Sequence, residues 1–321
     1  MTGITIPYVG KQRFFAEFLN EARNNVLHDA LASACVGIDP KILRDGMGNY
    51  VSAAGLRALQ GSGIRDEEVF VIPAILERKP SVLGYYRLLL GISQKQFYTK
   101  ETGLSPFKLM EDKDFIPPAA RMLVPSLCKA LNEAMSELIA SIPARTLKYN
   151  VQYLPIMSLG AQADGSWRNN IGANATQAVF DALKEIVKET DRGYEEKPNS
   201  ITVTNDSGRN VVLRLSPDPD IVILEYFGDE ATYKTAIEIK GGKDHANVHN
   251  RAGEAEKSHQ KAHQDGAQDC WTVIHLQGVD IEKLRQESPS TRQWFDLSSI
   301  TSHQGKSWDT MKRLVRSAMG I

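Results

Sequence analysis

Three side chains near two consecutive apolar segments have the types and spacing needed for chemistry on a phosphate. Asp220 directly precedes the apolar run 221–224, while Glu238 and Lys240 lie two residues apart at the end of the segment 234–240. Because side chains alternate along a strand, Glu238 and Lys240 share one face, and the isoleucines beside them point into the core. If the two strands pair as a hairpin, the carboxylates of Asp220 and Glu238 can converge on one hard cation.

The chemistry of this group suits a magnesium ion and a phosphodiester. Mg²⁺ prefers oxygen ligands and usually takes one or two carboxylates while keeping several waters, and the backbone carbonyl of Ile239 is a further candidate ligand. Such an ion polarises a phosphate and lowers the pKa of a bound water. The Lys240 ammonium could orient that water or stabilise the developing charge, and Gly241 and Gly242 allow the backbone to turn or to approach a phosphate closely. The pattern predicts phosphodiester hydrolysis.

The tripeptide Glu-x-Lys means little without this context. It also occurs at three places that do not lie in a convincing strand after a Pro-Asp-apolar strand: 77–79, 111–113 and 195–197. An amphipathic edge strand with a surface ion pair is the ordinary alternative for residues 238–240. The doubled Pro-Asp of the segment 216–220 leaves two registers for the motif aspartate, and we choose Asp220 over Asp218 because it directly abuts the strand.

The elements that carry these residues belong to the second half of the chain. Apolar periodicity and turn residues predict strands and helices in this order: strand 151–159, helix 175–189, strands 201–204, 211–215, 220–227 and 234–240, an alanine-rich helix 251–264 and strand 271–277. Arg251, Glu254 and Ser258 fall on one face of the alanine-rich helix. We therefore expect an α/β (α+β) fold, a mixed sheet with flanking helices.

The first half of the chain has a different sequence pattern. Apolar residues recur at helical spacing in four segments: 15–34, 52–60, 81–98 and 126–142. We therefore divide the chain into a mainly helical region, 1–145, and an α/β core, 146–321, which ends in a basic amphipathic helix at 306–321.

Composition limits the class of protein. The chain has 321 residues, 42% hydrophobic and 24% charged, which is enough for a buried core and excludes a disordered chain. Its net charge of −1 is unlike that of proteins that coat nucleic acid without specificity. We find no apolar run of about 18 residues and no secretory signal. Three widely spaced cysteines argue against a disulfide framework, so we expect a cytoplasmic protein.

The motif that contains Asp220, Glu238 and Lys240 also carries a resemblance to known nucleases. Pro219-Asp220 followed by Glu238-Ile239-Lys240, in the helix-strand-strand-strand-helix-strand order of 170–280, resembles the PD-(D/E)xK superfamily. The segment 71–98 resembles a block shared by several type II restriction endonucleases, and 237–262 is similar to the XcyI-like family. The resemblance implies a homodimeric, Mg²⁺-dependent endonuclease that cuts double-stranded DNA at a palindromic, GC-rich site, CCCGGG for XcyI-like enzymes. It also implies a cognate DNA methyltransferase in the same host.

The resemblance also assigns roles to residues. It implies that Asp220, Glu238 and Lys240 are catalytic and that the carboxylates and the Ile239 carbonyl hold the metal ion. The helical region 1–145 would embrace DNA or form the dimer. Superfamily members often place one more acidic residue on a helix before the motif, for which the sequence offers three candidates without deciding among them: Glu77, Asp181 and Glu185.

Basic residues after the catalytic strand are candidates for contacts with DNA. His249 or Arg251 could lie near the scissile phosphate because their segment follows that strand directly. Lys257 and Lys261, four residues apart, could reach the phosphate backbone. The ordinary alternative for these side chains is a solvated helix face.

Two other functions stay open at this point. The same fold could serve a DNA repair or junction nuclease, which would not cut DNA into discrete, sequence-selected fragments. A non-nuclease, histidine-rich zinc-binding protein is the second alternative, because six of the seven histidines follow residue 244. The pairs His245/His249 and His259/His263 have a spacing that suits a metal on a helix, although no HExxH glutamate accompanies them.

Overall fold

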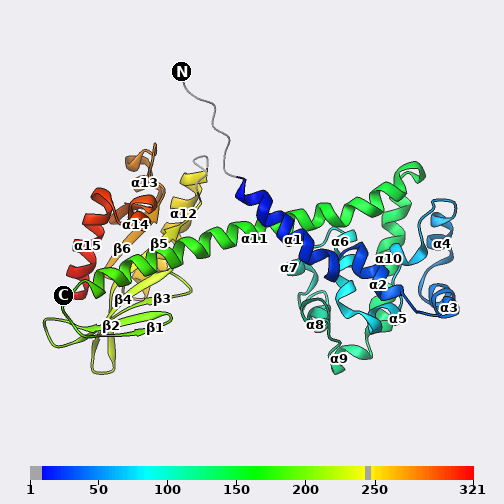
Figure 1. The fold of residues 1–321 in the computed structure, drawn as a ribbon, viewed down its shortest axis with the longest axis horizontal. Helices are drawn as coiled ribbons and strands as arrows, with labels where there is room; N and C mark the ends of the chain where they lie inside the picture. Colours follow the sequence, from blue (N-terminus) through cyan, green and yellow to red (C-terminus); the bar gives the residue numbers. More distant parts are fainter. Residues whose placement is uncertain (1–8, 243–246) are drawn as a thin grey trace, which may run out of the picture. The chain divides into compact units, whose positions relative to one another are not determined.

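The computed structural model describes residues 9–242 and 247–321 (Figure 1). The chain forms two compact units, with the boundary between Trp167 and Arg168. This boundary falls inside the helix α11 (Ala144–Lys188), so a single helix belongs to both units. Within the two described ranges, no helix combines the length and apolar character needed to cross a membrane.

The first unit is helical. Its elements before α11 are α1 (Gly10–Asn25), α2 (His28–Cys35), α3 (Pro40–Tyr50), α4 (Ala53–Leu59), α5 (Pro73–Arg78), α6 (Leu83–Leu89), α7 (Gln94–Phe97), α8 (Lys108–Lys113), α9 (Pro118–Arg121) and α10 (Val124–Ser141), with short 3₁₀ turns at Asp66–Glu68, Pro80–Val82 and Ser105–Phe107. The helices predicted at 52–60 and 126–142 are confirmed as α4 and α10, and the one predicted at 81–98 divides into α6 and α7.

Two predicted elements of this unit are wrong. The single helix at 15–34 is broken between α1 and α2, where extended backbone at Leu27 lets that side chain enter the core. The strand at 151–159 is part of α11: Val151 and Leu159 are buried, whereas Tyr153 and Met157 are exposed, a helical pattern of burial. A short apolar run fits either structure in the sequence, and packing decides between them.

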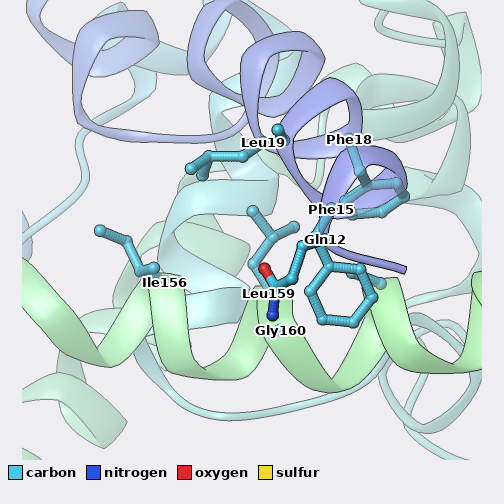
Figure 2. A pocket seen from close by; sticks show the side chains of 9 residues that line it. Gln12, Phe15, Phe18, Leu19, Ile156, Leu159 and Gly160 are labelled. Atoms are coloured by element: carbon cyan, nitrogen blue, oxygen red, sulfur yellow. The ribbon is translucent and has the colours of Figure 1, made fainter. Parts of the chain in front are cut away.

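The helix α1 lies against the first part of α11. An apolar groove of about 300 Å³ lies between them. Its lining includes Phe15, Leu19, Ile156 and Leu159 (Figure 2). Phe14 of α1 contacts Trp167 of α11, with ring centroids 5.4 Å apart. Contacts along both helices therefore hold this part of α11 within the first unit.

The second unit is a seven-stranded sheet in the order β1 to β7. Strands β1 to β5 are antiparallel, and β5, β6 and β7 are parallel. The strands are β1 (Tyr194–Lys197), β2 (Ser200–Thr204), β3 (Asn210–Leu215), β4 (Ile221–Phe227), β5 (Glu230–Lys240), β6 (Asp269–Ile274) and β7 (Gln293–Asp296). The α/β fold is confirmed, as are the predicted strands from β2 to β6, whereas β1 and β7 were not predicted.

Helices cover both faces of this sheet. The C-terminal part of α11 and α15 (Gly305–Met319) pack on the face that carries Ile237 and Ile239 of β5. On the other face, α12 (Val248–Gln264) packs through its alanines, with α13 (Ile281–Glu287) beside it. The short α14 (Leu297–Ser302) connects β7 to α15. Glu238 and Lys240, which alternate with the isoleucines, therefore lie on the α12 side of the sheet.

A buried ion pair lies within the core of the first unit. The Arg87 guanidinium is fully buried and donates to both carboxylate oxygens of Glu111, from Nε at 2.8 Å and from Nη2 at 2.5 Å. Tyr98 and Gln94 also donate to Glu111, at 2.7 and 2.8 Å. Burial alone would raise the pKa of Glu111, but these donors together hold it below its ordinary value. The Glu-x-Lys copy at 111–113 therefore carries a structural carboxylate.

Removing this carboxylate should destabilise the protein strongly. Glu111→Gln leaves the Arg87 charge buried without a counter-charge, which typically costs about 3–5 kcal/mol. Because the folded pKa of Glu111 lies below the ordinary 4.5, its contribution is present above that pH and lost as pH falls through the folded value. Urea unfolding should show a large difference from wild type at pH 7 and a smaller one in acid. The exposed Glu133→Gln is the control, and equal stability of the two variants would contradict the account.

Candidate active site

The start of β4 and the end of β5 meet at the candidate site. At this end of the two strands, the last antiparallel pair is Ile221 with Ile237. One residue before β4, Asp220 Oδ2 accepts a hydrogen bond from the backbone N–H of Ile239 at 2.8 Å. Beyond the pair of Ile221 and Ile237, the Asp220 carboxylate therefore accepts the hydrogen bond that a backbone carbonyl of β4 would otherwise accept. It lies beside β5.

Glu238 and Lys240 form a close pair on β5. Lys240 Nζ lies 2.9 Å from Glu238 Oε1, and the Glu238 side chain is only 8% exposed. The side chain of Lys240 is itself only 19% exposed, so the pair is largely shielded from water. This geometry differs from the surface ion pair that was the ordinary alternative.

A helix residue completes the surroundings of Asp220. Thr176 of α11 donates from Oγ1 to Asp220 Oδ1 at a long 3.4 Å. Thr176 and its neighbours on α11 line a cavity of about 410 Å³ together with Asp220, Glu238 and Lys240. Thr176 could not be predicted from the sequence, since a lone threonine in a helix has no spacing that points to a residue 44 positions later.

Burial perturbs all three ionisable groups. It raises the pKa of Glu238 to about 6, with the nearby Asp220 carboxylate adding to the effect and Lys240 opposing it. Burial also raises the pKa of Asp220, against the Ile239 N–H and Lys240. For Lys240 burial works toward a lower pKa, but Glu238 and Glu254 outweigh it and raise the pKa. A cation bound between the two acids would favour the ionised form of both carboxylates.

The two glycines after Lys240 allow close packing. A Cβ at Gly241 would lie 2.6 Å from Ala175 Cβ and 2.9 Å from the Ile171 carbonyl oxygen of α11. A Cβ at Gly242 would lie 2.2 Å from Arg251 Nη2. In the sequence these glycines indicate a turn or a close approach to a phosphate, whereas in the structure they leave room for α11 and the Arg251 guanidinium.

The alternative aspartate and two basic candidates of α12 make other contacts. Asp218 is exposed, and its Oδ2 lies 2.9 Å from Lys261 Nζ, a hydrogen bond that lowers the pKa of Asp218. Arg251 donates from Nη1 to the Gly242 carbonyl at 2.5 Å. The Asp218–Pro219 peptide bond is cis. Of the two motif aspartates, Asp220 is the one that lines the cavity.

The remaining basic candidates lie at the surface or pair elsewhere. His249 Nδ1 is 2.7 Å from Glu287 Oε2, and Lys257 is exposed on α12.

The three candidates for an additional acid lie outside the cavity lining. Glu77 is exposed on α5, in the first unit. Asp181 and Glu185 are exposed on α11 and pair with Lys184 at 2.8 Å and Lys188 at 3.2 Å. A further carboxylate beside Lys240 is that of Glu254, whose Oε2 is 3.5 Å from Lys240 Nζ.

The histidines do not form a metal site in the described chain. His245 lies outside the described residues. His259 is buried, with Nε2 2.8 Å from Thr272 Oγ1, and burial lowers its pKa to about 4. His263 Nδ1 is 2.9 Å from the Ala267 carbonyl. Among residues 9–242 and 247–321, no three His, Cys, Asp or Glu side chains are grouped to hold a metal, so the zinc-binding alternative gains no support.

The seven-stranded mixed sheet with flanking helices is consistent with a restriction-endonuclease-like fold. The model of the XcyI restriction endonuclease family matches residues 16–321. The type II restriction enzyme Cfr9I of Citrobacter freundii is 38% identical over 322 residues, covering 99% of this chain and 97% of that relative. The type II restriction enzyme XcyI of Xanthomonas campestris pv. cyanopsidis is 37% identical, covering 99% and 96%. The chain belongs to the XcyI restriction endonuclease family and is a type II site-specific deoxyribonuclease.

The raised pKa of Glu238 predicts that its ionised carboxylate destabilises the metal-free protein near neutral pH. With a folded pKa of about 6 and an ordinary value of 4.5, the folded state binds the extra proton, so the free energy of unfolding falls as pH rises between these values. In EDTA at pH 8, Glu238→Gln should therefore be more stable than wild type by about 1–2 kcal/mol.

Urea unfolding from pH 4.5 to 8 measures this effect, and the gain should vanish at the acid end. Asp181→Asn, at an exposed carboxylate of α11, should give no such gain. A Glu238→Gln protein that is no more stable than wild type at pH 8 would contradict the assigned pKa.

Proposed function

We propose that this enzyme hydrolyses phosphodiester bonds of double-stranded DNA with Mg²⁺, using Asp220, Glu238 and Lys240. The observation that carries the proposal is the hydrogen bond from the Ile239 N–H to Asp220, which brings a second carboxylate beside the Glu238–Lys240 pair. The three groups share a cavity of about 410 Å³. Membership in a restriction enzyme family supports DNA as the substrate.

The donor chemistry fits magnesium. Asp220 and Glu238 offer carboxylate oxygens, and within the described residues Asp220 Oδ1 accepts a long hydrogen bond from Thr176. The N–H and C=O of one residue point to the same edge of a strand, so the Ile239 carbonyl is directed to the side on which its N–H meets Asp220. Oxygen-only donors with room for water are what Mg²⁺ prefers. When bound, the ion would polarise the scissile phosphate and lower the pKa of the attacking water.

The protein's own groups orient the reactants. The Lys240 ammonium, an N–H donor inside the cavity, is placed to hold the attacking water or to donate to a phosphate oxygen as negative charge develops there. Thr176 and the Ile239 N–H hold the Asp220 carboxylate in one orientation. Fixed donors of this kind need little reorganisation during the reaction.

We further propose a palindromic, GC-rich target that resembles CCCGGG, with a cognate DNA methyltransferase protecting the host's own copies. The exposed ammonium groups of Lys257 and Lys261 would contact the phosphate backbone, with His249 and Arg251 nearer the cleaved bond. The helical region of 1–145 would embrace DNA or form the dimer. We assign the enzyme to the cytoplasm, where its three free cysteines would stay reduced.

Substitutions in the cavity should separate chemistry from binding. Asp220→Asn and Glu238→Gln should abolish Mg²⁺-dependent cleavage of plasmid DNA while leaving the fold intact. Lys240→Ala should lower the single-turnover rate by about 10²–10³-fold, yet retain site-selective binding with Ca²⁺, because its interaction is made mainly in the transition state.

Lys257→Ala and Lys261→Ala are the matched controls. Each should leave the rate of the chemical step unchanged and reduce the salt dependence of binding by about one ion. Wild-type cleavage by any of the three cavity variants would contradict the proposed site, and sequencing the product ends would identify the target.

The proposed palindrome implies a homodimer, because a twofold protein reads a twofold site. Sedimentation of the chain on a duplex that carries its site should give two protomers per duplex. One protomer per duplex at micromolar protein would contradict this proposal without affecting the assignment of the cavity.

A further inference from the structure

One face of α12 contacts the catalytic elements at three successive levels. Arg251 binds the Gly242 carbonyl just after β5, at 2.5 Å. One turn later, Glu254 Oε2 lies 3.5 Å from Lys240 Nζ. Further along, Lys261 lies 2.9 Å from Asp218, two residues before Asp220. This face of α12 therefore reaches both strands that carry the site.

The first of these contacts fixes the distance between α12 and β5. The Arg251 guanidinium lies so close to Gly242 that a Cβ at that position would be 2.2 Å from Nη2. Ala252 and Ala255 of α12 are fully buried, so small side chains set the helix close against the sheet. Glu254 lies between these two alanines in the sequence. The Arg251 contact and the buried alanines therefore fix the part of the helix that carries it.

Lys240 therefore has two carboxylate partners of different kinds. Glu238 is buried, lies 2.9 Å away and belongs to the proposed metal ligands. Glu254 has a side chain that is 62% exposed and lies 3.5 Å away, on a different element. A divalent cation on Glu238 would engage its oxygen lone pairs and repel the nearby ammonium. Of the two carboxylates that contact Lys240 in the described chain, Glu254 alone would then be available to hold it.

We propose that Glu254 is a positioning residue that retains the Lys240 ammonium beside the scissile phosphate when Glu238 binds the metal ion. This inference rests on the proposed metal-dependent cleavage. Glu254 acts through Lys240 and needs no contact of its own with DNA or metal.

The first test is the kinetics of Glu254→Gln on duplex DNA with Mg²⁺. We expect kcat to fall about 10- to 100-fold, the range typical when a residue that orients a functional side chain is removed. KM should be unchanged or lower because a negative charge near DNA is lost. Asp265→Asn, at an exposed carboxylate after the last turn of the same helix, should keep the wild-type kcat. A wild-type kcat for Glu254→Gln overturns the proposal, and so does a raised KM with kcat unchanged.

The second test needs neither metal nor turnover. DNA affinity in EDTA is measured for wild type, Glu254→Gln, Lys240→Ala and the double variant. Glu254→Gln should tighten binding because loss of this ion pair leaves the Lys240 charge less compensated when it faces a phosphate. This gain should be about two- to fivefold larger than in the Lys240→Ala background, the range of a partly exposed ion pair. Equal gains in both backgrounds overturn the proposal. Absence of cleavage by the wild-type enzyme would instead refute the proposed function.

Discussion

The hydrogen bond between the Ile239 N–H and the Asp220 carboxylate is the constraint on which the site depends. Antiparallel pairing of β4 and β5 ends at Ile221 and Ile237, and Asp220 extends the ladder by one step with a side chain. This places the carboxylate of Asp220, just before β4, and that of Glu238, on β5, together in a partly buried cavity. Their raised pKa values follow from the same burial, so the arrangement that would form the proposed cation site also makes the two ionised carboxylates unfavourable near neutral pH without a metal ion.

The surrounding elements each maintain this arrangement. Alternation along β5 puts its isoleucines into the core with α11 and α15, which leaves Glu238 and Lys240 on the opposite face. The glycine at 241 lets α11 approach closely enough for Thr176 to reach Asp220. On the other face, α12 brings Glu254 to Lys240. The buried Arg87–Glu111 pair, in contrast, stabilises the first unit and belongs to its core.

Local patterns predicted the central strands, and the three candidate residues that these strands position line one cavity. The strand β4 and the second half of β5 are rich in apolar residues, bounded by turn residues and preceded or ended by charged side chains, so their pairing could be predicted. Edge strand β1 could not, because Tyr194–Lys197 is exposed and polar throughout. The segment 151–159 was assigned to a strand because its apolar run is short, whereas burial on one side of α11 makes it helical. The Arg251, Glu254 and Ser258 face was visible in the sequence, but its target was not, since contacts between a helix and a strand depend on tertiary packing.

Anomalous diffraction from crystals soaked in Mn²⁺ would test the central claim most directly, because it locates the cation without relying on turnover. The account predicts a peak at bonding distance from carboxylate oxygens of both Asp220 and Glu238, and no such peak in crystals of Asp220→Asn. A peak bound by the α12 histidines instead, or an unchanged peak in Asp220→Asn, would contradict it.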